Sequence, residues 1–204
     1  MNARLPPALF LGFIAKKLHP VPPGEWGGAE EICSVSPCIA RYPDGWDDRP
    51  FDPPAFNPAY CMTKAADARN RVADAERPLT RIYALKIIPA VFTKDSPTPN
   101  LYDVDELFAR LGGLPELPDE RNMAGFERLG YDATVFGPLA DPGPCWGWSC
   151  SPLSCNFMAQ SHPVNRYCLI DDLDGAVAVA KAFARDEPEP GPYVIVEVFR
   201  EAAV

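Results

Sequence analysis

Short apolar runs separated by polar and proline-rich stretches recur along the chain, and most of them predict strands. The clearest run covers 81–92: it begins with alternating apolar and polar residues and is rich in β-branched types, a pattern typical of a strand. Because Pro89 lacks a backbone donor, we expect that end of the strand at an edge or a bulge. The runs predict five strands, at 9–16, 81–92, 131–136, 166–170 and 193–200.

Helices are predicted where apolar residues repeat on one face between a capping residue and a stop signal. The segment 172–185 is the strongest case, because an aspartate at its start can cap it and its apolar residues form one face. Five helices are predicted, at 63–75, 103–111, 118–129, 154–162 and 172–185. Together these elements predict a single α+β domain over residues 1–204, with one mixed or mainly antiparallel sheet of about five strands, about five helices and long Pro-rich loops.

Proline is the main departure from average composition, at 25 of 204 residues, more than twice its usual share of about 5%. Much of it lies in a region of about 17–60, where it prevents regular hydrogen-bonded ladders. The same region contains five aromatic residues, which predict that it packs down on the body of the protein. These residues are Trp26, Trp46, Phe51, Phe56 and Tyr60.

The charge balance limits the possible partners. The formal net charge is −9 and the pI is about 4.7, and a field of that sign repels phosphate backbones. We therefore expect no nucleic-acid binding, although a local basic patch formed by Arg69, Arg71, Arg77 and Arg81 is compatible with this balance.

The hydropathy of the chain and its cysteine content predict that the protein is cytoplasmic. No apolar run approaches the ~20 residues that span a membrane, so we expect a soluble protein that does not enter the bilayer. The chain has an odd number of cysteines and is not a short secreted scaffold, which predicts that most of them are free thiols in a reducing compartment. The cysteines are Cys33, Cys38, Cys61, Cys145, Cys150, Cys155 and Cys168.

Two segments, 33–38 and 150–155, share the pattern C-S-x-x-x-C with a proline inside, and three interpretations of them stay open. The first is structural: the serines and Asn156 satisfy tight turns and cap a following helix, while the cysteines pack as small apolar side chains. The second is a zinc site, which four thiolates could form if the two segments met in space. Its ligands would be Cys33, Cys38, Cys150 and Cys155.

The third interpretation is a catalytic thiol. Cys150 or Cys155 is the candidate nucleophile, because a thiol near a helix N-terminus has a lowered pKa. His162 is the candidate base. On a continuous helix, however, seven residues from Cys155 to His162 rise about 10 Å, too far for a direct hydrogen bond.

Several strings give the chain a resemblance to a known family. The strings CSPLSCN (150–156), VNRYCL (164–169), EPGPY (189–193), FLGFIAKK (10–17) and ICSVSPCI (32–39) are similar to those of an uncharacterised bacterial protein family. The resemblance covers most of the chain. It implies a single bacterial cytosolic domain and carries no implication about chemistry.

A second, weaker resemblance is to ADP-ribosyltransferases, which bind NAD. Ser34 and Ser36 could correspond to their serine-containing strand, and Glu197 to their glutamate on a late strand. The chain departs from that pattern in two places. Its first strand lacks a basic residue beside Gly or Thr, and the residue two positions before Glu197 is Ile195.

The functional expectation that follows is a soluble, non-catalytic binding or regulatory module. It would bind a protein partner or a small molecule through loops 26–60 and 141–156, where aromatic side chains stand on proline-stiffened loops that lose little entropy on binding. No phosphate-binding, metalloprotease or hydrolase motif is present, and no cofactor is favoured. The candidate binding residues are Trp46, Trp146, Trp148, Ser151, Ser154 and Asn156.

Overall fold

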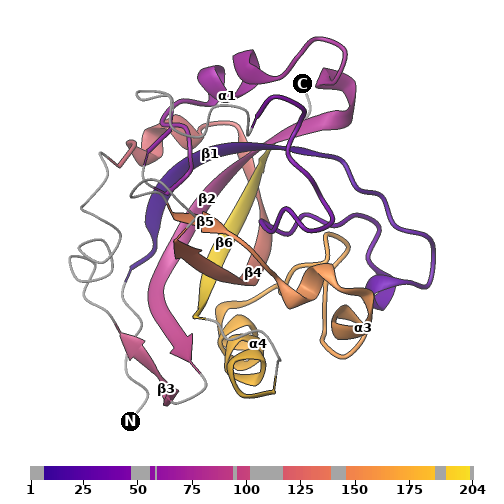
Figure 1. Cartoon of the computed structure of the whole chain (residues 1–204), viewed down its shortest axis with the longest axis vertical. Helices are drawn as coiled ribbons and strands as arrows, with labels where there is room; N and C mark the ends of the chain where they lie inside the picture. Colours follow the sequence, from indigo (N-terminus) through magenta and orange to yellow (C-terminus); the bar gives the residue numbers. More distant parts are fainter. Residues whose placement is uncertain are drawn as a thin grey trace.

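The computed structural model is built around an antiparallel sheet of four long strands (Figure 1). In spatial order these are β1 (Leu9–Lys17), β2 (Thr80–Thr93), β6 (Tyr193–Glu201) and β4 (Phe126–Pro138). The short strands β3 (Ser96–Leu101) and β5 (Trp146–Trp148) pair with β2 and β4. The structure describes residues 7–46, 56–57, 59–93, 96–101, 117–138, 146–186 and 192–202.

The sheet is covered on both of its faces, which explains why its central strands are nearly all apolar. In β6, Val194 and Val196 point into one core, while Tyr193 and Ile195 point into a second core. The first core lies between the sheet and the long N-terminal loop, whose Trp46 is completely buried.

The second core lies under the longest helix, α4 (Leu173–Asp186), which packs on β2, β4 and β6 (Figure 1). Its residues Ala176, Val179, Ala180 and Phe183 are buried against the sheet. The other α-helices in the described part of the chain are short: α1 (Ala65–Arg71) and α3 (Asn156–Ala159). None of the helices in the described ranges is long and apolar enough to cross a bilayer.

Single 3-10 turns connect several of these elements. Their bounds are Trp26–Gly28, Arg77–Leu79, Glu120–Met123 and Pro152–Ser154.

The prediction of about five helices and five strands is wrong. Four long antiparallel strands form the sheet and no described ladder is parallel. Among the described helices only α1 and α4 exceed a single turn, so the α+β class is only loosely consistent with the structure. The helix predicted at 118–129 is a 3-10 turn followed by the start of β4, because Gly125 has a positive φ of 85° and the chain then pairs with β6.

Two further predicted elements have different outcomes. The strand predicted at 166–170 is a loop whose backbone pairs with β4 at a single isolated bridge between Ile170 and Tyr131. The side chain of Asn165 accepts hydrogen bonds from the backbone of Tyr167 and Leu169 within this loop. The helix predicted at 103–111 lies outside the described residues.

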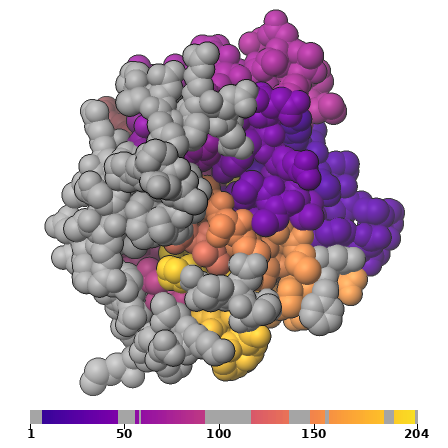
Figure 2. Space-filling model, in the orientation of Figure 1, coloured from indigo at the N-terminus to yellow at the C-terminus, as the bar shows by residue number. Residues whose placement is uncertain are grey.

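The proline-rich region packs against the body where the structure describes it. Trp46 stacks on Tyr42 and meets Phe56 edge-on, and Phe56 stacks on Tyr60. Phe51 lies outside the described residues. The segment before Trp46 runs beside the loop at 165–167, where the backbone N–H groups of Glu30 and Glu31 donate to the carbonyl of Arg166. Figure 2 shows these two parts of the chain, indigo to purple and orange, side by side on one face.

Candidate functional site

The two C-S-x-x-x-C segments meet in space, and Asp132 on β4 joins them. One oxygen of its buried carboxylate accepts hydrogen bonds from the hydroxyl of Ser34 and the backbone N–H of Val35, both at 2.8 Å. The other oxygen accepts one from the hydroxyl of Ser151 at 2.5 Å. Ser34 and Ser151 are fully buried. The serines therefore have a structural role, but through Asp132: the hydroxyl of Ser151 does not cap the turn that follows it.

A buried lysine completes this junction. The ammonium group of Lys16, on β1, donates to the backbone carbonyls of Ser34, at 2.6 Å, and of Ser36. Burial lowers the pKa of Lys16 to about 7, although the nearby Asp132 acts in the opposite direction. Burial also raises the pKa of Asp132, with its three hydrogen bonds opposing the shift. Because all of these groups are closed off from solvent, they hold the loops on the sheet and present no surface to a ligand.

The four cysteines of the zinc interpretation do not gather. Among the described residues, no group of three or more potential ligands of the His, Cys, Asp and Glu types is close enough to hold a metal ion. Cys33 is buried against the hydroxyl of Tyr83, and burial raises the pKa of its thiol to about 12. Cys38 is exposed and donates to the carbonyl of Ser149 at 3.3 Å.

The candidate thiol and base are not brought together either. Cys155 is exposed, and its hydrogen bonds within the described chain are all made by its backbone. The ring of His162 packs edge-on against Phe183, with 5.1 Å between centroids, and burial lowers its pKa. No contact in the described ranges joins the two side chains. The thiol-enzyme hypothesis therefore stays a prediction without an assembled dyad.

The remaining sequence-predicted residues lie in the core or in ion pairs. Trp46 and Trp148 are buried. Ser154 is buried as well, and its hydroxyl donates to the carbonyl of Ser151. Glu197 lies on β6 and pairs with Arg128 on β4 at 2.8 Å. The structure gives backbone positions in β5 and α3 for Trp146 and Asn156, whose side chains lie outside the described set.

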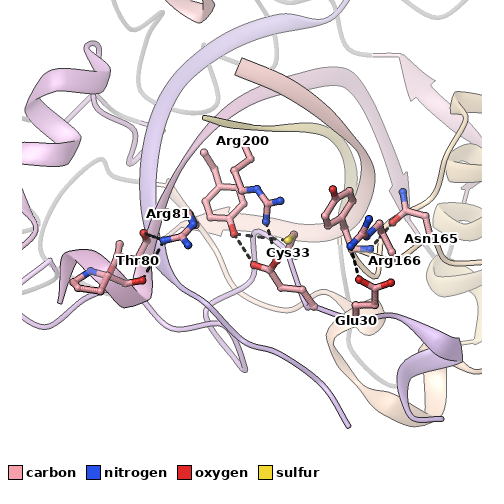
Figure 3. Close-up of polar contacts among 11 residues, drawn as sticks. Glu30, Cys33, Thr80, Arg81, Asn165, Arg166 and Arg200 are labelled. Atoms are coloured by element: carbon pink, nitrogen blue, oxygen red, sulfur yellow. Dashed lines mark hydrogen bonds and ion pairs between the residues drawn. The ribbon is translucent and has the colours of Figure 1, made fainter. Parts of the chain in front are cut away.

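A large groove opens elsewhere, where the beginning of β2 meets the end of β6 (Figure 3). Its volume is about 1400 Å³. The other walls come from the loop around 18–31, the region from α1 to the start of β2, and the loop at 165–167. Although the chain as a whole is acidic, five arginines line the groove. They are Arg69, Arg77, Arg81, Arg166 and Arg200.

Most of these arginines are held in place by carboxylates. Arg200 pairs with Glu31 at 2.8 Å, and Glu31 also accepts a long hydrogen bond of 3.4 Å from the Tyr83 hydroxyl. Arg166 pairs with Glu30 at 2.5 Å, as Figure 3 shows. Arg69 makes a two-donor contact with Glu201, and Arg77 pairs with Asp74 at 2.8 Å.

Two aromatic contacts stiffen the wall formed by Tyr167. The guanidinium of Arg200 lies 5.0 Å from the centroid of its ring, and that of Arg166 lies 5.5 Å from it. Such cation–π contacts fix a guanidinium while leaving its N–H donors available.

Arg81 differs from the other four arginines. Its guanidinium donates only to the backbone carbonyls of Pro78, at 3.2 Å, and Thr80, at 2.9 Å. It has no carboxylate partner among the described residues. A guanidinium has five N–H donors in a fixed fork, and both of these contacts use one terminal nitrogen. Arg81 therefore keeps donors for an incoming anion.

Sequence reasoning identified part of this groove. The basic patch considered for Arg69, Arg71, Arg77 and Arg81 supplies three of its five arginines, while Arg71 instead donates to the carbonyl of Trp46. Arg166 and Arg200 lie far away in the sequence and no local signal marked them. The place of Arg200 follows from the order of the strands, which puts the end of β6 beside the beginning of β2, and that of Arg166 follows from the backbone contacts of its loop with Glu30 and Glu31.

Comparisons of the chain with protein-family models, with curated proteins and with solved structures find no match.

Proposed function

We propose that the protein is a binding module whose groove holds a small molecule that carries a carboxylate or a phosphate group. The observation that carries this proposal is the gathering of five guanidinium groups in one groove, where they outnumber the four glutamates of the lining although the chain as a whole has a net charge of −9. Arg81 is the proposed anchor, because it lacks a carboxylate partner in the described structure and its planar fork matches the geometry of such anions.

The other arginines set the shape of the site. Arg200 is fixed between Glu31 and the ring of Tyr167, so it forms a rigid wall of the groove, and its ion pair with Glu31 offsets most of its charge. Ligand pockets commonly have volumes of about 300–1000 Å³. A groove of about 1400 Å³ suits an extended ligand whose anionic end lies at Arg81.

Several features favour binding over catalysis at this groove. The thiol nearest to its charged wall, Cys33, lies against Tyr83, and a pKa of about 12 keeps it protonated at neutral pH. Cys155, His162 and Glu197 do not line the groove. Of the loops expected to bind, region 26–60 supplies Glu30 and Glu31 to the groove, whereas residues 146–156, the part of segment 141–156 that the structure describes, supply none of its lining.

Calorimetric titration with two probe anions, inorganic pyrophosphate and citrate, tests the proposal. We expect the wild-type protein to bind at least one of them, and Arg81→Ala to weaken that binding about tenfold or more, since a hydrogen bond to a charged group contributes about 1.5–3 kcal/mol. The matched control is Lys181→Ala, which removes the same charge from the exposed surface of α4.

An equal loss of affinity in Arg81→Ala and Lys181→Ala would show that anion binding depends only on the overall charge of the protein. Binding that is unchanged in Arg81→Ala, or absent from the wild-type protein, would contradict the proposed site.

A further inference from the structure

The contact between the two cysteine segments brings one exposed thiol beside another cysteine. The sulfur of Cys38 donates to the carbonyl oxygen of Ser149 at 3.3 Å, and Cys150 is the next residue. In a trans peptide the carbonyl oxygen lies on the same side of the C–N bond as the following Cα. The Cys38 sulfur is therefore at most roughly 6 Å from the Cα of Cys150.

Cys150 is held firmly in this position. Its carbonyl accepts hydrogen bonds from the backbone N–H of Val135, at 2.7 Å, and from the hydroxyl of Thr134, at 2.9 Å. The N–H of Ser149 donates to the carbonyl of Val135 at 3.1 Å. Two successive residues thus oppose one residue of β4, which is the arrangement of a bulge.

Cys38 is held from the other side. The hydroxyl of Ser36 donates to the carbonyl of Ser149 at 2.8 Å and accepts from the backbone N–H of Cys38 at 3.2 Å. The same segment is fixed to the sheet through Ser34 and Asp132. A disulfide needs Cα atoms about 4.4–6.8 Å apart. The bound on the Cys38 sulfur places the two Cα atoms within about 9 Å of each other, so closure requires rotation of both side chains and, at the far end of this range, a small shift of the exposed segment at Cys38.

We propose that Cys38 and Cys150 form a redox pair that closes into a disulfide when a peroxide oxidises the protein. In the first step the thiolate of Cys38 attacks a peroxide oxygen of H₂O₂. The O–O bond breaks, hydroxide leaves, and Cys38 becomes a sulfenic acid. In the second step the Cys150 sulfur attacks the sulfenic sulfur and releases water. The two thiols lose two electrons and two protons, and H₂O₂ is reduced to two waters.

Burial protects three of the other cysteines from this reaction, while Cys155 is exposed like Cys38 but has no part in the contact at Ser149. Cys33 and Cys168 are buried, and burial raises the pKa of each thiol to about 12. Cys61 is fully buried, and its pKa is raised as well. These three thiols stay protonated and shielded from peroxide, whereas Cys38 is exposed and Cys150 is half-buried.

The test starts from fully reduced protein, treats it with H₂O₂, blocks remaining thiols with an alkylating reagent and maps tryptic peptides without reduction. Trypsin leaves Cys33 and Cys38 together on peptide 18–41, and Cys145, Cys150 and Cys155 together on peptide 129–166. We expect these two peptides to be linked, with a mass two hydrogen atoms below their sum, and the link to disappear with dithiothreitol.

Single variants assign the sulfurs. Cys38→Ser and Cys150→Ser are expected to abolish the link, while Cys33→Ala, Cys145→Ser and Cys155→Ser are expected to retain it. Circular dichroism of each variant checks that it is folded. A link that survives Cys38→Ser or Cys150→Ser would overturn the proposal. So would a link confined to peptide 129–166, or oxidation of Cys38 to sulfinic acid without any link.

Discussion

At the scale of single residues, the buried lysine is the most unusual group in the protein. Lys16 is fully enclosed, yet its ammonium group has two carbonyl partners and a carboxylate nearby. Buried charges are costly unless hydrogen bonds and an opposite charge offset their desolvation. The lowered pKa shows that desolvation is the larger effect here.

The pKa of Lys16 predicts a rise in stability with pH. In the folded protein this pKa is about 7, below its ordinary value of 10.5, so between these values the unfolded chain binds a proton that the folded chain does not. The free energy of unfolding therefore rises with pH in this window, by up to about 1.4 kcal/mol per pH unit. Urea unfolding of wild type and of Lys16→Met at several pH values measures this dependence. We expect the free energy of unfolding to rise with pH in wild type and not in Lys16→Met.

Wild type and Lys16→Met are best compared at the lower end of the pH range between the folded and unfolded pKa values of Lys16. Burial raises the pKa values of Cys33 and Tyr83, so the unfolded chain loses those protons first, and stability falls as pH passes their ordinary values of 9.0 and 10.0. Wild type and Lys16→Met both keep Cys33 and Tyr83, so the contributions of these two groups cancel in the difference between the two free energies of unfolding. Parallel curves for wild type and Lys16→Met would contradict the assignment.

At the scale of elements, two glycines let loops cross close to strands. Gly12 interrupts the register between β1 and β2 with a φ of 127°, and a Cβ there would collide with the carbonyl of Met62. Gly130 similarly interrupts the register between β4 and β6, with a φ of 148° and the carbonyl of Ile170 2.8 Å from the position of a Cβ.

Gly12→Ala is therefore expected to destabilise the protein by about 2 kcal/mol or more, because it combines backbone strain with a clash against backbone. Gly28→Ala is the matched control. It also has a positive φ, of 88°, but a Cβ there has open space around it. Thermal unfolding measures the stability of both variants. A similar loss of stability in Gly12→Ala and Gly28→Ala would show that the positive φ alone, and not the clash with Met62, destabilises Gly12→Ala.

Sequence pattern was sufficient for the elements that bury a continuous apolar run. The predicted strands at 9–16, 81–92, 131–136 and 193–200 correspond to β1, β2, β4 and β6, and the helix at 172–185 corresponds to α4. Pattern failed at 166–170 because Cys168, Leu169 and Ile170 are buried as a loop, with Cys168 at a φ of 58°. It also failed before β4, where pairing with β6 outweighs local helix preference.

At the scale of the whole molecule, one carboxylate connects parts that are far apart in the sequence. Asp132 binds the segment at 34–35 and the segment at 151 to the middle of the sheet. The contact was hidden from sequence reasoning because nothing in the sequence marks an aspartate in the middle of an apolar strand as the partner of two serines.

Asp132→Ala is expected to lower the free energy of unfolding by about 3–5 kcal/mol, since it leaves three buried donors without their acceptor and removes the carboxylate that favours the charged form of Lys16. Asp67→Ala, on the exposed face of α1, is the matched control and is expected to change stability little. Urea denaturation measures both. A loss below about 1 kcal/mol in Asp132→Ala would mean that the two segments are held mainly by their apolar contacts.

The position of β6 bears on how the chain reaches its folded state during synthesis. This strand lies between β2 and β4 and pairs with one edge of each, while the other edge of β2 pairs with β1. A ribosome releases β2 and β4 long before it releases residues 193–201, so those two strands wait with unpaired edges until β6 emerges. Long-range pairing of this kind is slow and leaves strands open to association, so the nascent chain is expected to need protection by a chaperone until its last strand is inserted.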